Sequence, residues 1–393
     1  MSVPGRHSLL SVLAVNPMLS ARIVAPDTIG SRQRPGNREE RSGLNEGPGI
    51  LSAEFLPMTD RPVADHGGAL DRAVARYGGR RDVWVDLSTG INPWPYPVPA
   101  VSAEAWTRLP DAGRLAGLEA VARGFYGAPT DAPLIAAPGS QALIQLLPRL
   151  VPPTEVAIVG PTYAEHARCW ALAGHRVRVV ELGDLNNGPI ASVLVLVNPN
   201  NPDGRLFQPD RLLSLARAQA DRGGLLVVDE AFAELMPAAS LAPHAGMPGL
   251  VILRSFGKFF GLAGLRLGFA FGPAETIGAL DAAFGPWAVA GPALEIGEKA
   301  LLDRAWATET RARLAAATRA LDETLSTAGL EPIGGTDLYR LVRVADAGRL
   351  ADRLGSRHIL VRRFVDRPDR LRFGLPPDLA AETRLRAALS NKD

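Results

Sequence analysis

Hydrophobic residues along the chain follow a regular pattern only from about residue 64. Helices are predicted over 66–77 and 115–126, with a strand at 83–87 and a proline-rich stretch at 92–99 between them. Apolar strands then alternate with helices near 141–150, 164–173 and 209–222. Seven strands are expected, at 134–136, 155–159, 177–180, 192–197, 225–228, 251–253 and 267–271. The alternation predicts an α/β fold in which a mostly parallel seven-stranded sheet is covered by helices on both faces.

The pattern changes after residue 285. A long helix is expected over 292–328, followed by strands near 337–342, 358–362 and 370–374. Residues 1–57 lack sustained periodicity and are rich in Pro, Gly, Ser and Arg, which predicts a disordered extension. We therefore expect four parts: this extension, an N-terminal segment at 58–95 that packs with the small domain, a large domain at 96–285, and a smaller α+β domain at 286–393.

Composition excludes several classes of protein. The 393 residues carry a net charge of +2, so no basic surface for nucleic acid is expected. Cys169 is the only cysteine, which allows no intramolecular disulfide and suits a reducing cytoplasm. The six histidines show no metal-ligand spacing, so no metal is expected. No apolar run is long enough to span a membrane.

Lysine is rare in this chain. Of the 43 basic residues only Lys258, Lys299 and Lys392 are lysines, and the rest are arginines. An amine can become neutral and attack a carbonyl group, whereas a guanidinium cannot. Lys258 lies among glycines and phenylalanines, while the other two lysines lie in polar surroundings. The pattern therefore makes Lys258 the candidate for covalent chemistry.

Residues 251–271 carry the strongest chemical signal. A buried strand is followed by Ser255, Lys258 and Arg266, interspersed with glycines that let a backbone approach a ligand closely. Apolar neighbours would desolvate the Lys258 amine and favour its neutral, nucleophilic form. Ser255 and Arg266 offer a hydroxyl and a cation to one phosphate group. A nucleotide-binding P-loop is excluded because Phe259, and not Ser or Thr, follows the lysine.

Three more segments place polar groups at the ends of predicted strands. Asp229 ends an apolar strand, where a carboxylate is costly unless it meets a cation. Residues 198–204, Asn-Pro-Asn-Asn-Pro-Asp-Gly, form a turn after another strand. Ser140 begins a helix, whose free amides favour a phosphate. Each segment also has an ordinary structural explanation, as a cap, a turn or an N-cap, so their significance lies in their combination.

The pattern S-x-G-K-x-x-G-L-x-G-x-R-x-G at 255–268 resembles the lysine motif of fold-type-I pyridoxal-phosphate enzymes, the superfamily of aspartate aminotransferase. The resemblance spans residue 64 to the C-terminus and implies aminotransferase fold type I. It implies that Lys258 holds pyridoxal 5′-phosphate as an imine and that Asp229 pairs with its pyridine nitrogen. The other implied cofactor-binding residues are Ser140, Gln141, Tyr163, Asn201, Ser255 and Arg266.

Two positions depart from the pattern of that superfamily. Many relatives have a tyrosine three residues after the aspartate, where this chain has Phe232. Asp203 stands where a threonine is usual. The first change removes a hydroxyl that could contact the ring oxygen of the cofactor.

Within the superfamily the nearest resemblance is to the threonine-phosphate decarboxylases of cobalamin biosynthesis. It rests on Asp-His-Gly-Gly at 65–68, on Asp-Leu-Ser-Thr-Gly-Ile-Asn-Pro at 86–93 and on Phe232. The resemblance implies that His66 helps to hold a substrate phosphate, that Asn92 lies near the substrate, and that Arg362 binds a substrate anion. Arg372, in the Arg-Leu-Arg-Phe-Gly stretch at 370–374, matches the arginine that grips the substrate α-carboxylate. Decarboxylation of L-threonine O-3-phosphate by a cytoplasmic homodimer is the expected function.

Two other functions are considered. An aminotransferase, for instance one acting on histidinol phosphate, would share the lysine motif and a phosphate pocket. Such enzymes often have a Tyr-Pro-Asp stretch with a tyrosine that reaches the neighbouring subunit's cofactor, but residues 109–114 contain no tyrosine. A non-catalytic regulator would need a DNA-binding domain, and residues 1–57 show no helix-turn-helix pattern.

Overall fold

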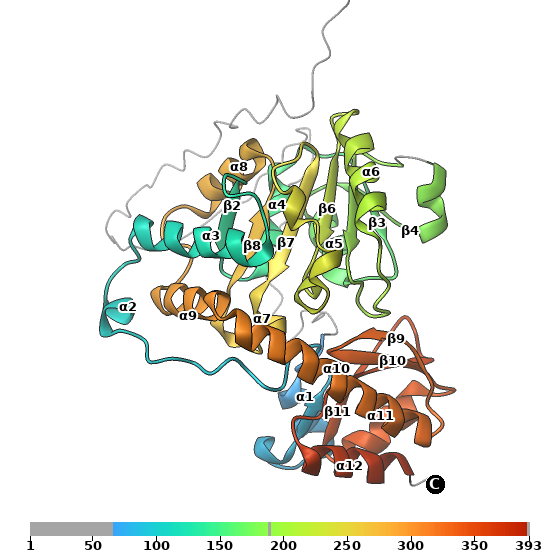
Figure 1. The fold of residues 1–393 in the computed structure, drawn as a ribbon. Coiled ribbons are helices and arrows are strands. Elements are labelled where there is room, and N and C mark those ends of the chain that lie inside the picture. Colours follow the sequence, from blue (N-terminus) through green and yellow to red (C-terminus); the bar gives the residue numbers. More distant parts are fainter. Residues whose placement is uncertain (1–65, 188–189, 391–393) are drawn as a thin grey trace, which may run out of the picture. The chain divides into compact units, whose positions relative to one another are not determined.

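The structure is a computed structural model that describes residues 66–187 and 190–390. The extension expected at 1–57 lies outside these residues. Figure 1 shows the two sheets and the helices around them. The larger sheet has seven strands in the order β2-β8-β7-β6-β5-β3-β4. They are β2 (Leu134–Ala137), β3 (Glu155–Val159), β4 (Arg176–Val180), β5 (Val193–Val197), β6 (Leu225–Asp229), β7 (Leu250–Ser255) and β8 (Gly268–Phe271).

The prediction of a mostly parallel seven-stranded sheet is confirmed. Neighbouring strands pair in parallel from β4 to β7, and only β8 runs antiparallel to both of its neighbours. The carboxyl ends of β3, β5, β6 and β7 therefore meet at one edge of the sheet. Ligands of open α/β sheets bind at this kind of edge.

Side chains of the strands alternate between two apolar layers, as the two-residue period of a strand requires. In β5, Leu194 and Leu196 face one layer, whereas Val193 and Val195 face the other. The first layer is completed by α3 (Ala112–Tyr126), α6 (Pro209–Ala220) and α9 (Gly291–Leu302). The second contains α4 (Ser140–Leu150), α5 (Ala164–Leu172) and α8 (Ala274–Phe284). The sheet is thus covered on both faces, as its continuous apolar strands predict.

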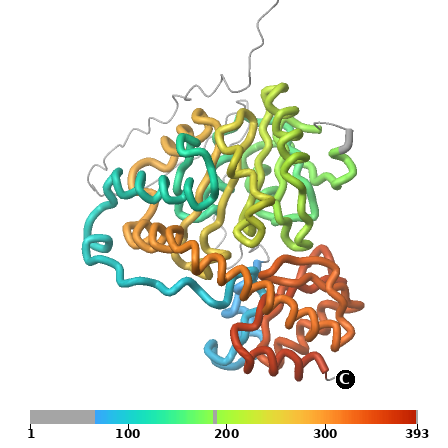
Figure 2. The backbone as a smooth tube through the Cα atoms, in the orientation of Figure 1, coloured from blue at the N-terminus to red at the C-terminus, as the bar shows by residue number. Residues whose placement is uncertain are grey.

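The smaller sheet has five strands in the order β1-β11-β12-β10-β9. Its first strand comes from far away in the sequence and pairs in parallel with β11, so the blue start of the described chain lies beside the red C-terminal part in Figure 2. The strands are β1 (Val85–Leu87), β9 (Pro332–Thr336), β10 (Tyr339–Arg343), β11 (Ile359–Arg363) and β12 (Arg370–Gly374). The helices of this region are α1 (Leu70–Tyr77), α10 (Arg304–Thr327), α11 (Ala347–Gly355) and α12 (Leu379–Ser390).

Several expected boundaries were wrong. The single helix expected over 292–328 is two helices, α9 and α10, because the chain leaves helical geometry at Asp303. The Asp303 carboxylate accepts the Trp306 backbone N–H at 2.9 Å and so caps the second helix. The first helix begins at Leu70 and not at residue 66. The sequence reasoning also missed β9, the short helices α2 (Ala103–Thr107) and α7 (Phe256–Phe259), and the helices α8, α11 and α12.

Among residues 66–187 and 190–390, no helix combines the length and the apolar character needed to cross a membrane. The same residues contain no group of three or more His, Cys, Asp or Glu side chains arranged to hold a metal ion.

Candidate active site

The segments singled out in the sequence gather at the carboxyl edge of the larger sheet. Lys258 lies in α7, directly after β7, and Asp229 is the last residue of β6. The Asn198–Gly204 turn follows β5, and Tyr163 lies between β3 and α5. Ser140 opens α4 immediately after β2. The parallel arrangement of the strands thus brings motifs that are up to about 120 residues apart to one place.

Burial and neighbouring charges make the Lys258 amine unusually acidic for a lysine. Desolvation and the positive charges of Arg372 and Arg266 together lower its pKa from 10.5 to about 8, against an opposing effect of Asp229. In the described part of the chain the amine makes no hydrogen bond. It is therefore free to form the covalent bond for which its sequence motif is typical.

Asp229 is buried and held from two sides. Its Oδ2 lies 2.9 Å from Nε2 of His166, and its Oδ1 accepts the Ala231 backbone N–H at 3.1 Å. Asp229 ends β6 and Lys258 follows the neighbouring strand β7, so the two residues lie at the same edge of the sheet. A fixed carboxylate in this place can hold a proton on a pyridine nitrogen.

His166 was missed by the sequence reasoning. It is buried in α5, three residues after Tyr163, and the two rings lie 6.1 Å apart in an edge-on contact. A histidine three residues after a candidate stacking tyrosine, in the first turn of the helix that follows it, is a signal that was present in the sequence. Its contact with Asp229 orients the carboxylate.

A cradle for a phosphate forms where α4 begins. Gly139 has a φ of 89°, and a Cβ at this position would lie 2.8 Å from the Arg266 guanidinium. A Cβ at Gly268 would lie 2.4 Å from the backbone nitrogen of Ser140. The two glycines therefore let the helix start, Arg266 and the end of β7 at Ser255 approach one another.

Tyr163 and Gln141 are joined to each other beside this cradle. The Tyr163 hydroxyl donates to Gln141 Oε1 at 3.0 Å, and Gln141 Nε2 donates to Glu165 at 3.2 Å. Burial raises the Tyr163 pKa to about 12, so the phenol keeps its proton. His66 packs against the Tyr163 ring at 5.7 Å and reaches the same carboxylate, at 3.2 Å.

Arg372 connects the two sheets at the site. One of its nitrogens donates to Asn201 Oδ1 at 2.6 Å and another to the Ser88 carbonyl at 2.8 Å. Its guanidinium lies 4.7 Å from the centre of the Tyr339 ring. Desolvation lowers the Arg372 pKa to about 10, and its Nε has no hydrogen-bond partner among the described residues. The site thus contains a buried cation with an unused donor, which suits a carboxylate ligand.

Arg362 is the neighbour of Arg372 across the strand pair β11 and β12. The charge of Arg362 contributes to the lowered pKa of Arg372, so the two cations face one region. Arg370, on the same strand as Arg372, has only 16% of its side chain exposed and pairs with Asp369 at 3.3 Å.

Two other predicted positions have mainly structural contacts. Asn92 is buried, donates to the Phe259 carbonyl at 2.9 Å and accepts the Trp94 N–H at 2.9 Å. Its side chain therefore fixes the proline-rich stretch at 92–99 against α7, the helix that contains Lys258. Phe232 packs edge-on against Tyr339 with ring centres 5.4 Å apart. Tyr339 itself, a residue that the sequence did not indicate, donates its hydroxyl to the Asn200 carbonyl at 2.8 Å.

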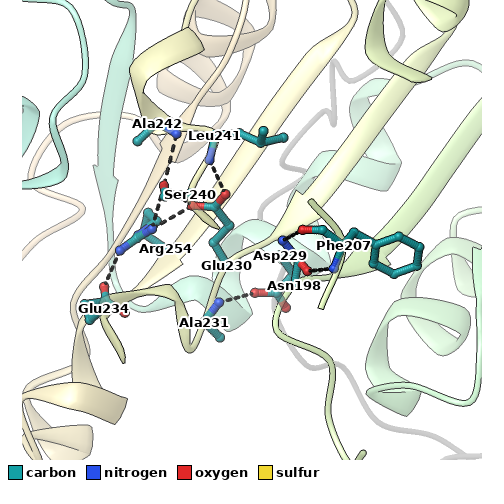
Figure 3. A network of polar contacts seen from close by, with 10 residues as sticks. All are labelled: Asn198, Phe207, Asp229, Glu230, Ala231, Glu234, Ser240, Leu241, Ala242 and Arg254. Carbon is teal, nitrogen blue, oxygen red and sulfur yellow. Dashed lines mark hydrogen bonds and ion pairs between the residues drawn. The ribbon is translucent and has the colours of Figure 1, made fainter. Parts of the chain in front are cut away.

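A buried polar network supports the strand ends behind the site, as Figure 3 shows. Glu230 follows Asp229 and accepts hydrogen bonds from Arg254, the Ser240 hydroxyl and the Leu241 N–H, each at 2.6 Å. Arg254 also pairs with Glu234 at 2.9 Å, and burial raises the Glu234 pKa. Because Arg254 precedes Ser255, the network ties the end of β6 to the end of β7.

These groups fit pyridoxal 5′-phosphate. The site has a desolvated lysine for the aldehyde and a fixed carboxylate for the ring nitrogen. It also has a glycine-lined cradle, which Cβ atoms would fill, for the phosphate. Among them Lys258, Asp229, Ser140 and Arg266 would hold the cofactor.

Comparison with known proteins agrees with this geometry. Residues 100–389 match the model of the family "Aminotransferase class I and II". The chain is 47% identical to threonine-phosphate decarboxylase of Pseudomonas aeruginosa, over 83% of this chain and 97% of that protein. It is 29% identical to histidinol-phosphate aminotransferase of Desulfitobacterium hafniense, over 75% and 88% of the two chains. The structure of histidinol-phosphate aminotransferase from Sinorhizobium meliloti, in complex with pyridoxal-5′-phosphate, superposes with a TM-score of 0.71 at 23% identity. That match covers 86% of this chain and 97% of the other.

Proposed function

The chain belongs to the class I and II aminotransferase family, and from this premise we propose that it decarboxylates L-threonine O-3-phosphate. The product is (R)-1-amino-2-propanol O-2-phosphate, an intermediate of cobalamin biosynthesis, and the cofactor is pyridoxal phosphate. The observation that carries the choice of reaction is the 47% identity to a threonine-phosphate decarboxylase over nearly its whole length. The paired cations Arg362 and Arg372 support it, because this substrate carries both a carboxylate and a phosphate.

When bound, pyridoxal phosphate supplies an electron sink for the bond that breaks at the substrate Cα. The residues of the chain make this sink effective and direct it. Asp229, oriented by His166, would keep a proton on the ring nitrogen. Ser140, Gln141, Ser255 and Arg266 would hold the phosphate end, and Tyr163 would pack on the ring.

Lys258 handles the proton that decarboxylation requires. Loss of CO2 leaves Cα with an electron pair, and one proton must arrive there to complete the product. The Lys258 Nζ, with a pKa of about 8, exchanges a proton readily near neutral pH. Lys258 is the residue that we assign to deliver that proton.

We infer that Arg372 orients the substrate carboxylate. Held by the guanidinium, the carboxylate would take one fixed direction at Cα, and this direction would favour cleavage of the bond between Cα and the carboxylate. Asn201 and the Ser88 carbonyl hold the arginine in place before substrate arrives. Arg362 and His66 would bind the substrate phosphate and so fix the other end of the molecule.

We propose that the enzyme is a cytoplasmic homodimer. Large apolar side chains are exposed on and near α2, with Trp106 69% exposed and Val98 and Leu109 also exposed. Exposed apolar groups close together in the sequence are typical of an interface. A sedimentation or gel-filtration experiment that finds an active monomer would exclude the dimer. A location in the cytoplasm is consistent with a single cysteine.

The decisive experiment incubates the purified, cofactor-loaded enzyme with O-phospho-L-threonine and without a keto acid. Release of CO2 with one equivalent of aminopropanol phosphate is the expected result. If no CO2 appears, but 2-oxoglutarate and histidinol phosphate together give glutamate and a carbonyl product, the chain is an aminotransferase and the proposal is wrong.

A further inference from the structure

Glu165 is a buried carboxylate beside the site that no step above uses. It is the second residue of α5, and only 4% of its side chain is exposed. A negative charge near the start of a helix is favourable, and Arg168 pairs with Glu165 from the same helix at 3.2 Å. Neither fact explains its burial, since desolvating a carboxylate is costly and a residue at the start of a helix can stay in water.

The two oxygens of Glu165 contact two different parts of the site. Oε1 lies 3.2 Å from His66 Nε2, and Oε2 accepts a hydrogen bond from Gln141 Nε2 at 3.2 Å. The other end of Gln141 binds the Tyr163 hydroxyl. A continuous chain of contacts therefore runs from a histidine expected at the substrate phosphate to residues expected at the cofactor.

Glu165 provides the only hydrogen bond to the His66 side chain within the described residues. The backbone next to His66 is fixed as well, because the Gly68 N–H binds the Ser88 hydroxyl at 2.7 Å and a Cβ at Gly67 would overlap the Ser88 carbonyl. That carbonyl is the one that accepts from Arg372. The Nε2 of the imidazole thus contacts Glu165, and Nδ1 makes no hydrogen bond to another described residue.

We propose that Glu165 is a positioning residue that orients His66 toward the substrate phosphate and thereby selects phosphorylated substrates. Its carboxylate accepts a hydrogen bond from Nε2–H and fixes the ring, so that the imidazolium form of His66 donates Nδ1–H to a phosphate oxygen. This inference rests on the proposed function, since it assumes that the phosphate of the substrate lies at His66. The hydrogen bond from Gln141 fixes the Glu165 carboxylate relative to the residues expected at the cofactor.

A double-mutant cycle tests the proposal on the cofactor-loaded enzyme. The KM and kcat for O-phospho-L-threonine are measured for wild type, Glu165→Gln, His66→Ala and the double variant. Glu165→Gln should raise KM roughly 5- to 15-fold, the effect of losing a charge-assisted hydrogen bond in a partly exposed place, and change kcat less than about threefold. In the His66→Ala background the same substitution should change KM less than about twofold, because Glu165 acts through His66.

Two further measurements separate this role from a structural one. The inhibition constant of L-threonine, which lacks the phosphate, should be the same in Glu165→Gln and wild type. The affinity for pyridoxal phosphate and the melting temperature of the apoenzyme should change little. Glu119→Gln is the matched control. Glu119 lies on α3 and is a half-buried carboxylate that accepts a hydrogen bond from the Ala136 N–H of β2. It should leave all constants unchanged.

Three results would overturn the proposal. The first is a Glu165→Gln effect on KM that is equally large in the wild-type and His66→Ala backgrounds. The second is a rise in the inhibition constant of L-threonine as large as the rise in KM for O-phospho-L-threonine. The third is an unchanged KM in Glu165→Gln. If the wild type releases no CO2 from O-phospho-L-threonine, the proposed function fails separately. The double-mutant cycle then uses the dissociation constant of O-phospho-L-threonine in place of KM, measured by the change in cofactor absorbance. Glu165→Gln should again raise this constant in wild type and leave it nearly unchanged in His66→Ala.

Discussion

The pKa of Lys258 leads to a prediction that can be measured directly. Burial and two nearby arginines lower it to about 8. At pH 7.5 this leaves roughly a quarter of the amine neutral, against about one part in a thousand at the ordinary pKa of 10.5. We therefore expect the reactivity of the Lys258 amine in the apoenzyme to rise with pH and to reach half its maximum near pH 8.

Two substitutions should move this midpoint in opposite directions. Arg372 contributes a positive charge that disfavours the ammonium, so Arg372→Met should move the midpoint to higher pH. Asp229 favours the ammonium, so Asp229→Asn should move it to lower pH. Arg370→Met is the control, because Arg370 lies on the same strand as Arg372 but is not among the charges that act on Lys258.

The assay is a short pulse of a small acylating reagent at each pH, followed by mass spectrometry of the peptide that contains Lys258. The chain has only three lysines, so the peptide is easily assigned. The rate at which the apoenzyme takes up pyridoxal phosphate gives a second, independent curve. A midpoint close to pH 10.5 in both curves would refute the claim that the site desolvates the amine. An unchanged midpoint in both variants would refute the assigned charge effects.

Three further predictions concern the supporting structure. Arg254→Met should lower the free energy of unfolding by about 3–5 kcal/mol in urea titrations, because it leaves the buried carboxylates of Glu230 and Glu234 without their cation; a loss below 1 kcal/mol would contradict this. Glu234→Gln should gain stability relative to wild type as pH rises, since a raised pKa means that Glu234 contributes stability below its unfolded pKa and loses it as pH rises through the folded value. A stability difference between the two proteins that stays constant at all pH values would exclude a raised pKa of Glu234. Gly139→Ala should weaken pyridoxal-phosphate binding by about tenfold or more, because φ is 89° and the new methyl group would lie 2.8 Å from the Arg266 guanidinium; unchanged affinity in a fluorescence titration would show that the cradle tolerates the methyl group.

The larger sheet was predictable because each of its strands carries a local signal. Strands such as β5 and β6 are continuous apolar runs that must be buried on both faces, and the helices between them follow from their own periodicity. The strand order then places the residues after each strand at one edge. The positions of Lys258, Asp229 and Ser140 relative to the sheet could therefore be inferred without knowing any contact.

Contacts between distant segments could not be inferred in the same way. The roles of His166, Glu165 and Tyr339 depend on which side chains the completed fold brings against Asp229, His66 and Asn200. The division between α9 and α10 could not be predicted either, because the helical pattern of apolar residues continues through the single capping residue Asp303. The β9 strand has two glycines in five residues and so lacks the side chains that identify a strand.

The contacts of Arg372 suit the role proposed for it, which is to favour loss of CO2 over loss of a proton. The guanidinium is held by Asn201 from the large sheet and by the Ser88 carbonyl from the segment after β1. Both contacts exist without substrate, so the arginine does not have to be ordered when a carboxylate arrives. Among the described residues the Arg372 Nε has no partner, which leaves one direction for a further ligand. A carboxylate bound in that direction would have its orientation fixed by two elements far apart in the sequence. The choice of bond would then depend on the relative placement of the two sheets rather than on an additional catalytic group.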